Sequence, residues 1–426
     1  MTPEVKQRIE QIQQGIVPKG YKKTKTAIVP ADWKESPIRE YIREYTEKTT
    51  IPNQYPVLTS ARTGLMLQTD YYSNRQVTTE DNVGYNVLPY GYITFRSRSD
   101  DGRFRFNENR IIEHGIISYF YPVFSFSEEV CHEYMLYLLN FSIYRRMYPY
   151  AEGTAQQVLS LKKLGQLKYS LPLVAEQKKI VEILATQDKA IELQERKIDE
   201  LKRFKKGYLE RMFPRKGQKV PEKRFPGFTD DWEQRKAIDI ADYSKGNGYS
   251  KGDLTDAGTP IILYGRLYTK YQFAISEVDT FAVPRNGAVY SQGNEVIVPA
   301  SGETAEDIAR ASAVEKSGVL LGSDLNILRP FDFINPLFLA LAISNGEPQK
   351  ELAKKAQGKS VVHIHNTDIQ EVTIAYPSRT EQDRIVSVFR QLDNLITLHQ
   401  RKLEEMKNQK KALMQLLLTG IVRVRL

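Results

Sequence analysis

Cysteine, histidine and long apolar runs are all scarce in this chain of 426 residues. Cys131 is the single cysteine, so the chain can form no internal disulfide, which is typical of proteins kept in a reducing cytosol. No run approaches the roughly 18 to 20 apolar residues that a membrane-spanning helix needs. The charged opening MTPEVKQRIEQ lacks the apolar stretch of a signal peptide. We therefore expect a cytoplasmic location.

Motifs for nucleotide or metal chemistry are also lacking. The GKS at residues 358–360 resembles a phosphate-binding loop, but Ala353 stands where that motif needs a glycine. The two histidines of VHIHN have no cysteine or further histidine near them in sequence that would complete a metal site. The acidic stretch SGETAEDIAR fits a helix start capped by Ser301 or Thr304 better than the metal site of a nuclease. We therefore predict no catalytic and no metal-binding residues.

Positive charge and tyrosine are abundant instead. Lysine and arginine total 61 against 52 acidic residues, which gives a net charge of +9, and the chain holds 25 tyrosines. Clustered cations gain free energy by releasing counterions from a polyphosphate, and tyrosine both stacks on bases and bonds phosphates. These features indicate an anionic partner such as nucleic acid, although tyrosine is also a common strand residue.

The sequence contains an internal repeat. AEQKKIVEILATQDKAI begins at Ala175 and TEQDRIVSVFRQLDNLI at Thr380, so that Glu176 aligns with Glu381 at an offset of 205 residues (381 − 176). The tryptophans of PADWKE and TDDWEQ align at an offset of 199 (232 − 33). A tandem duplication of this kind predicts two domains of the same architecture.

Each half of the sequence has a strand-rich body followed by a long helix. Alternating pieces such as NVLPYGYITFRSR predict strands, and apolar segments predict one short helix per body, over 132–144 and 336–343. We expect an α+β fold with two mixed domains in tandem repeat, separated by two long antiparallel helices that pair as in a coiled coil. The predicted segments are an N-terminal helix and lead-in (1–29), a first domain (30–171), a central helix (172–213), a linker (214–231), a second domain (232–375) and a C-terminal helix (376–426).

The apolar positions of the long helices step by four and seven residues. Gln187, Gln194 and His399 interrupt this stripe with polar side chains, which would fix the register of the pair. A further helix over 3–17 ends in VPKG, which resembles the FPRKG after the central helix. We expect it to pack beside the C-terminus, a loosely attached helix being the alternative. The residues predicted to pair the long helices are Ile180, Leu184, Ile191, Ile198, Leu201, Tyr208, Ile385, Phe389, Leu392, Ile396, Leu403, Met406 and Leu413.

The chain resembles, over its whole length, the specificity subunit of type I restriction-modification systems. The resemblance lies in the paired helix openings Pro-x-x-x-Glu-Gln-x-x-Ile at Pro172 and Pro377, each preceded by a glycine, Gly153 or Gly358. It extends to MFPRKGQKVPEKRFPGFTDDWE after the central helix, to YGRLYT and SGETAEDI in the second body, and to the closing LLLTGIVRVR.

The resemblance implies a sequence-specific DNA-binding protein that is not itself an enzyme. Two target-recognition domains would each read one half of a bipartite, asymmetric site on double-stranded DNA. The helices would act as spacer and dock two modification subunits, which bind S-adenosylmethionine and methylate adenine, together with restriction subunits that translocate and cut DNA. This chain would hold no cofactor. The alternative from another class is a protein-binding scaffold with two adaptor domains on a helical stalk, whose DNA binding would lack a steep salt dependence.

Candidate DNA-binding residues are hydroxyl, amide and basic side chains on loops, because base edges are read by fork or amide geometry and phosphates by positive charge. In the first domain they are Ser60, Arg62, Thr63, Arg96, Arg98, Arg103, Arg105, Asn107 and Asn109. In the second domain they are Lys245, Asn247, Lys251, Arg266, Tyr268 and Lys270. Solvated arginines in a hairpin are the alternative for the first set.

Overall fold

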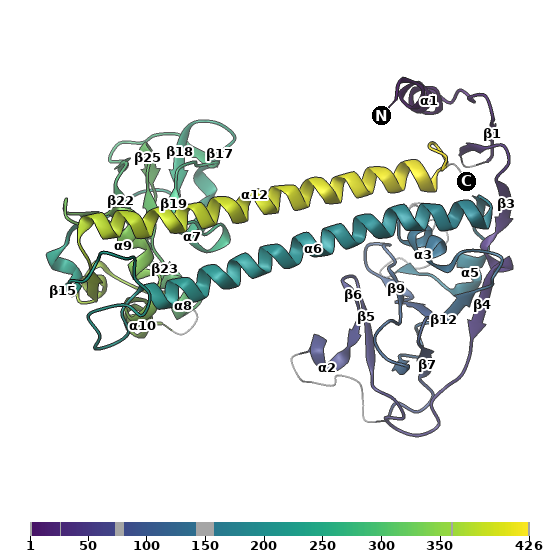
Figure 1. Ribbon diagram of the computed structural model, residues 1–426, viewed down its shortest axis with the longest axis horizontal. Coiled ribbons are helices and arrows are strands. Elements are labelled where there is room, and N and C mark those ends of the chain that lie inside the picture. The colour runs from purple at the N-terminus through teal and green to yellow at the C-terminus, as the bar shows by residue number, and fades with distance from the viewer. Residues whose placement is uncertain (1, 26, 73–80, 142–156, 359–360, 425–426) are drawn as a thin grey trace. The chain divides into compact units, whose positions relative to one another are not determined.

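The computed structural model describes residues 2–25, 27–72, 81–141, 157–358 and 361–424, and the chain divides into two compact units (Figure 1). The first unit contains residues 1–193 and 403–426, and the second contains residues 194–402. The long helices α6 (Val174–Met212) and α12 (Arg379–Leu418) each contribute one part to both units. The units therefore do not follow the linear order of the chain.

The first unit builds its body from short antiparallel strands. These are β1 (Tyr21–Lys23), β2 (Ile28–Pro30), β3 (Lys34–Pro37), β4 (Ile42–Tyr45), β5 (Leu58–Ala61), β6 (Gly64–Leu67), β7 (Asn86–Pro89), β8 (Ile93–Phe95), β9 (Arg98–Ser99), β10 (Phe106–Glu108), β11 (His114–Ile117), β12 (Val123–Phe126), β13 (Gln157–Val158) and β14 (Lys168–Leu171). The largest sheet has the order β10-β8-β12-β4, and the other strands form pairs.

Apolar side chains of this sheet pack against the helices of the first unit. Phe95 of β8 and Phe124 of β12 share a buried cluster with Leu138 and with Ile180 and Leu184 of α6. The shorter helices are α1 (Pro3–Gln13), η1 (Ile38–Glu40), α2 (Gln68–Tyr71), α3 (His132–Phe141) and α5 (Leu161–Gly165). The predicted helix over 132–144 is thus present as α3, while its residues 142–144, like Gly153, lie outside the described residues.

The second unit contains two five-stranded sheets. Its strands are β15 (Glu233–Lys236), β16 (Ala241–Lys245), β17 (Leu254–Thr255), β18 (Thr259–Ile262), β19 (Ala274–Ile275), β20 (Phe281–Ala282), β21 (Tyr290–Gln292), β22 (Glu295–Pro299), β23 (Ser301–Gly302), β24 (Ser312–Val314), β25 (Ser317–Leu321), β26 (Leu325–Pro330), β27 (Val362–His363) and β28 (Thr373–Tyr376). The sheet orders are β16-β26-β22-β24-β19 and β17-β20-β18-β25-β21. Each of these sheets contains one pair of adjacent strands that run parallel: β24 with β19 in the first and β18 with β25 in the second.

The helices of the second unit cover a core that includes the fully buried Phe338 and Phe389. They are η3 (Ala237–Asp239), η4 (Lys251–Asp253), α7 (Arg266–Thr269), α8 (Ala305–Ile308), α9 (Pro336–Ile343), α10 (Gly346–Lys355) and α11 (Asn366–Gln370). The predicted helix over 336–343 is confirmed as α9. Thr304 caps α8 by accepting a hydrogen bond from the Asp307 N–H, so the acidic stretch there begins a helix as predicted.

The sequence repeat corresponds to a repeated structural frame. β3 pairs antiparallel with β14 in the first unit, and β15 pairs antiparallel with β28 in the second. Trp33 and Trp232, the residues that precede β3 and β15, are both buried. Each body also has one apolar helix in the same place in the repeat, α3 or α9. The predicted α+β class with two mixed domains in tandem is confirmed.

The long helices run antiparallel inside each unit. In the first unit Asp188 of α6 pairs with Lys410 of α12, and Ile180 and Leu184 share a core with Met414 and Leu418. In the second unit Lys205 lies 2.5 Å from Asp393. The other predicted pairing positions are buried (Ile191, Ile198, Ile385, Phe389, Ile396) or half-buried (Leu201, Tyr208, Leu392, Leu403, Met406, Leu413).

Gln194 and His399 pair with each other across the helices of the second unit. The Gln194 amide nitrogen lies 2.8 Å from the His399 carbonyl oxygen, to which it donates, and 2.8 Å from the His399 ring Nδ1. The two residues occupy equivalent positions in the repeat, since they differ by 205 in number (399 − 194). A half-buried polar pair of this kind between two helices selects one register, as the interruptions of the apolar stripe predict.

The N-terminal helix lies beside the C-terminal end of α12 within the first unit (Figure 1). Arg8 donates from its guanidinium to the Ile421 carbonyl at 2.7 Å, and the Tyr21 hydroxyl donates to the Gly420 carbonyl at 2.8 Å. The predicted packing of this helix beside the C-terminus is therefore confirmed, although α1 ends at Gln13.

Candidate nucleic-acid interface

The arginine-rich loop of the first unit connects β8, β9 and β10. Arg96 and Arg98 are exposed and alternate with the buried Ser97 and Ser99, as the two-residue period of an extended chain requires. The Arg98 guanidinium lies over the Phe120 ring, 4.4 Å from its centroid. Arg103 and Arg105 are also exposed. The loop therefore presents four of the predicted DNA-binding arginines on the surface of the first unit.

The amide and hydroxyl candidates beside this loop are buried. The Asn107 amide nitrogen donates to the Ser60 hydroxyl and to the Ala61 carbonyl, both at 2.9 Å. The Asn109 amide nitrogen donates to the carbonyls of Leu88 and Ile112, and the side chain is fully buried. Asn107, Asn109 and Ser60 therefore fix the hairpins to one another in this conformation, and their donors are not presented to a ligand.

Arg62 and Thr63 lie at the turn of the β5–β6 hairpin and are exposed. Arg62 forms an ion pair with Asp101 at 2.7 Å, and Asp101 also accepts from the Ser99 hydroxyl and the Arg103 N–H. Asp101 thus connects the hairpin turn to the arginine loop. The structure brings most of the first predicted set together at one place.

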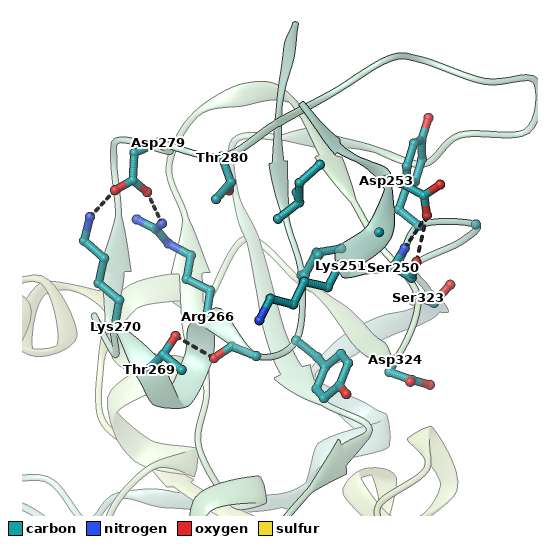
Figure 2. Close-up of a pocket in the computed structure, with 17 residues that line it drawn as sticks. Ser250, Lys251, Asp253, Arg266, Thr269, Lys270, Asp279, Thr280, Ser323 and Asp324 are labelled. Carbon is teal, nitrogen blue, oxygen red and sulfur yellow. Dashed lines mark hydrogen bonds and ion pairs between the residues drawn. The ribbon is translucent and has the colours of Figure 1, made fainter. Parts of the chain in front are cut away.

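A cavity of about 1060 Å³ in the second unit is lined by three of its six predicted residues, Lys251, Arg266 and Lys270 (Figure 2). Asp279 holds Arg266 and Lys270, with an N–O distance of 2.5 Å to each, and these contacts keep the Arg266 side chain mostly buried. Lys251 enters the same cavity from η4 and has no ion pair among the described residues. Lys251 is therefore a cation that the second unit presents to solvent without an internal counter-charge.

Two further candidates in the second unit are used internally. The Asn247 amide nitrogen donates to the Gly287 carbonyl at 3.1 Å, and the Tyr268 hydroxyl donates to the Ser301 carbonyl at 2.8 Å. Lys245, at the end of β16, is exposed. At the edge of the cavity the Ser250 N–H, the Arg285 guanidinium and the Ser250 hydroxyl lower the pKa of Asp253 to about 2. That carboxylate is therefore ionised and neutralises Arg285.

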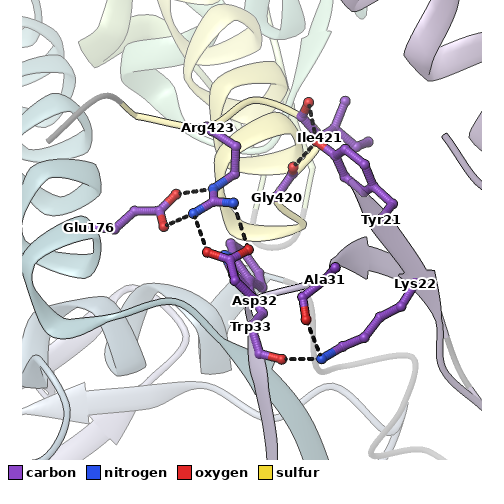
Figure 3. A network of polar contacts seen from close by, with 9 residues as sticks. All are labelled: Tyr21, Lys22, Ala31, Asp32, Trp33, Glu176, Gly420, Ile421 and Arg423. Carbon is purple, nitrogen blue, oxygen red and sulfur yellow. Dashed lines mark hydrogen bonds and ion pairs between the residues drawn. The ribbon is translucent and has the colours of Figure 1, made fainter. Parts of the chain in front are cut away.

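An arginine holds the glutamate at the start of each long helix in a guanidinium clamp, which the sequence pattern did not predict. In the first unit Arg423 donates to both carboxylate oxygens of Glu176 at 2.7 Å and to both of Asp32 at 2.8 and 2.9 Å (Figure 3). In the second unit Arg224 donates to both oxygens of Glu381 at 2.8 Å. Arg224 and Arg423 are separated by 199 residues (423 − 224), the same offset that relates the two tryptophans. This shared offset is the sequence feature that could have identified the two arginines as equivalent.

The glutamine beside each clamped glutamate fixes the opening of the helix. The Gln177 carbonyl oxygen accepts from the Cys131 N–H at 2.7 Å, and the Gln382 oxygen accepts from the Asn335 N–H at 2.8 Å. Each amide nitrogen also donates to the carbonyl of the proline five residues earlier, at 2.9 Å. The repeated Glu-Gln is thus explained by the frame and presents no group for ligand chemistry.

The family model for the type I restriction modification DNA specificity domain matches residues 30–203 and 229–408. The chain belongs to this family. Two matches, one in each half, agree with the two bodies and their repeated frame.

Two specificity subunits from Methanocaldococcus jannaschii are similar to this chain. The MjaVIII type I restriction enzyme specificity subunit is 23% identical over 285 residues, which are 64% of this chain and 66% of that protein. The putative MjaX subunit is 23% identical over 302 residues, 68% of each protein. The chain thus matches about two thirds of the length of these relatives.

Solved structures share the fold. A chain from a study of complex assembly and conformational transition of the type I restriction-modification system has a TM-score of 0.57 and 15% identity, covering 92% of this chain and 99% of that one. The crystal structure of the type I S subunit from M. genitalium has a TM-score of 0.54 and 13% identity, covering 94% and 99%. At such identities the likeness concerns the fold alone.

Among the described residues, no helix is both long and apolar enough to span a membrane.

Proposed function

We propose that this chain is the DNA-reading component of a type I restriction-modification complex and binds a bipartite, asymmetric site on double-stranded DNA. The observation that carries the proposal is one repeated frame bearing two different bodies. The clamps, the glutamine contacts and the β3–β14 and β15–β28 pairs recur, whereas the sheets and loops around Arg98 and Lys251 differ between the units. A shared frame with different loops suits two readers of different half-sites.

The chain acts in this proposal without catalytic groups of its own. Two modification subunits, which would carry S-adenosylmethionine, dock on the long helices, and restriction subunits complete the complex in the cytoplasm. The helices serve as the spacer between the two readers. Support comes from the family membership and from the relatives, which are named as specificity subunits of type I restriction enzymes.

An exchange of one body tests the proposal. The segment 232–375 is replaced by that of a relative, the chimera is expressed with its modification subunits, and methylated adenines are mapped by sequencing. We expect one half of the methylated motif to change and the other half to persist. Exchange of 30–171 is the matched control and should change the opposite half. A motif that changes in both halves, or no methylation dependent on this chain, would contradict the proposal.

Salt dependence separates a DNA reader from a scaffold that binds proteins. We expect the logarithm of the DNA association constant to fall steeply with the logarithm of salt concentration, because each neutralised phosphate releases counterions. Lys251→Gln should reduce the slope by about one. Lys270→Gln is the matched control in the same cavity, because Lys270 is already paired with Asp279 and should change the slope less. A shallow slope for the unaltered chain would favour the scaffold.

A further inference from the structure

A cavity of about 880 Å³ lies in the first unit next to the arginine loop. Ser97, which stands between the exposed Arg96 and Arg98, lines it, as does Phe120, whose ring contacts Arg98. β4, the start of β12 and the segment around Ser160 complete the wall. The cavity therefore adjoins the predicted DNA-binding surface and contains none of the residues that form the guanidinium clamp.

Exposed aromatic rings form part of this wall. Tyr119 is 54% exposed and Phe120 43% exposed, and their ring centroids are 4.1 Å apart. The ring of Tyr85 packs edge-on against Tyr119 and supports it. Large rings gain most of their stabilising free energy from burial, so an adjacent pair left in solvent at the edge of a cavity is suited to stack on a flat ligand.

Uncompensated positive charge lines the same cavity. Arg39, Lys48 and Lys162 are exposed, and none of them has an ion pair among the described residues, whereas Glu44 supplies one carboxylate to the lining. In the cavity of the second unit Lys251 is the one lining cation without an ion pair among the described residues, because Asp279 pairs with both Arg266 and Lys270. An anionic ligand with a flat ring system satisfies both the rings and the charges of the first cavity, and a nucleotide has this chemistry.

We propose that this cavity holds a nucleotide of the bound DNA that has left the base stack. The base stacks on Tyr119 and Phe120, and its phosphates face Arg39, Lys48 and Lys162. The inference rests on the proposed function, since it assumes that the first unit binds DNA. It goes beyond that function by assigning to one reader, and not to the other, a site for an unpaired nucleotide.

The test uses the full chain and two duplexes that carry its methylated motif. One duplex is fully paired, and the other has a single unpaired 2-aminopurine in the half-site that the first body reads. We expect the second duplex to bind about tenfold more tightly, because its base is already unpaired, whereas the paired duplex must first release a nucleotide from the stack. Its fluorescence should be quenched when the base stacks on the rings. Phe120→Leu should abolish the quenching and the preference for the unpaired duplex.

Tyr90→Leu is the matched control for the ring, because Tyr90 is 53% exposed in the same unit but lies outside the cavity lining. It should retain both the quenching and the tighter binding. For the charges, Arg39→Gln and Lys162→Gln should weaken binding of the unpaired probe several-fold, while Lys168→Gln, exposed on β14, should not. Equal thermal midpoints establish that each variant is folded.

The outcomes separate the two proposals. Equal binding of both duplexes by the unaltered chain overturns the nucleotide site and leaves the proposed function standing, whereas failure to bind the paired duplex overturns the proposed function. Competition by free dAMP, lost in Phe120→Leu and without any preference for the unpaired duplex, would assign the cavity to free nucleotides and overturn its assignment to DNA. Tighter binding that persists in Phe120→Leu also overturns the site.

Discussion

The two guanidinium clamps hold equivalent glutamates by different means. Arg423 binds Glu176 and Asp32 together and is 37% exposed, whereas Arg224 binds Glu381, is 13% exposed, and has a buried Nη1 with no hydrogen-bond partner among the described residues. Asp231 is the repeat equivalent of Asp32 (231 − 32 equals the offset of 199), but it pairs with Lys219. The clamp supplied by the chain terminus therefore has more partners than the clamp supplied by the linker.

This difference shows which contacts the frame requires and which it tolerates. Both copies keep the bidentate bond between arginine and glutamate, and both glutamates are nearly fully buried. Bidentate charge-assisted bonds are stronger and more directional than neutral ones, so they can fix the direction in which a helix leaves a body. The second carboxylate, Asp32, joins the clamp in the first unit, whereas its repeat equivalent Asp231 pairs elsewhere in the second.

The largest expected effect comes from removing one arginine. Arg224→Ala leaves the carboxylate of Glu381, 1% exposed, without its partner, and we expect the free energy of unfolding to fall by about 3 kcal/mol. Arg423→Ala should cost less, about 2 kcal/mol, because water reaches Glu176 through the more exposed site. Urea unfolding of both variants measures the two values. Equal losses would show that the exposure of the clamp does not matter.

The glutamines should behave alike in the two copies. Gln177→Ala removes two hydrogen bonds and Gln382→Ala three, the third being donated to the Phe333 carbonyl. Each change leaves a buried N–H, of Cys131 or Asn335, without a partner, at a cost of about 2 kcal/mol. Hydrogen exchange of those two amides, read by mass spectrometry, should accelerate locally in each variant. A loss in one variant only would mean that the frame is not equivalent at this position.

Much of the frame could be predicted from the sequence because its signals are local and repeated. The helix openings, the apolar stripe and the polar interruption at Gln194 and His399 all follow a helical period or the offset of 205 residues. The clamps were missed because Arg423 and Glu176 lie 247 residues apart, and only the tertiary fold brings them together. Asn107 and Asn109 were predicted to read DNA because amide side chains on a loop can bind base edges. The fold uses their amides internally instead, since Asn107 donates to Ser60 and Ala61, and Asn109 donates to the carbonyls of Leu88 and Ile112.

A glycine at the end of α12 permits the close approach of the chain terminus. Gly420 has a φ of +73°, and a Cβ there would lie 2.5 Å from Pro30 Cδ and 3.0 Å from the Trp33 ring. Gly420→Ala should therefore destabilise by about 2 kcal/mol through backbone strain and overlap. Gly217→Ala in the linker is the control, since Gly217 has a φ of +77° but open space at its Cβ, and it should cost about 1 kcal/mol. A difference in thermal midpoints between the variants isolates the overlap.

The smallest expected effect concerns the ion pairs between the long helices, Asp188 with Lys410 and Asp393 with Lys205. The four residues are equivalent in the repeat, and each lysine also lies over a ring, of Tyr137 or Phe273. All four side chains are partly exposed, so double-mutant cycles with Asp→Asn and Lys→Met should give coupling energies of about 0.5 to 1 kcal/mol in both units.

The single Asp→Asn changes should nevertheless differ between the units. Asp188 accepts a further hydrogen bond from the Tyr137 hydroxyl at 2.6 Å, which helps to raise the pKa of that phenol, after the larger effect of burial. Asp188→Asn weakens that bond and should cost about 1 kcal/mol more than Asp393→Asn, because hydrogen bonds to charged groups are stronger than neutral ones. In a Tyr137→Phe background the extra cost should vanish, since the hydroxyl is gone. If it persists there, the difference arises from the packing of α3 against α6 and not from the charge on Asp188.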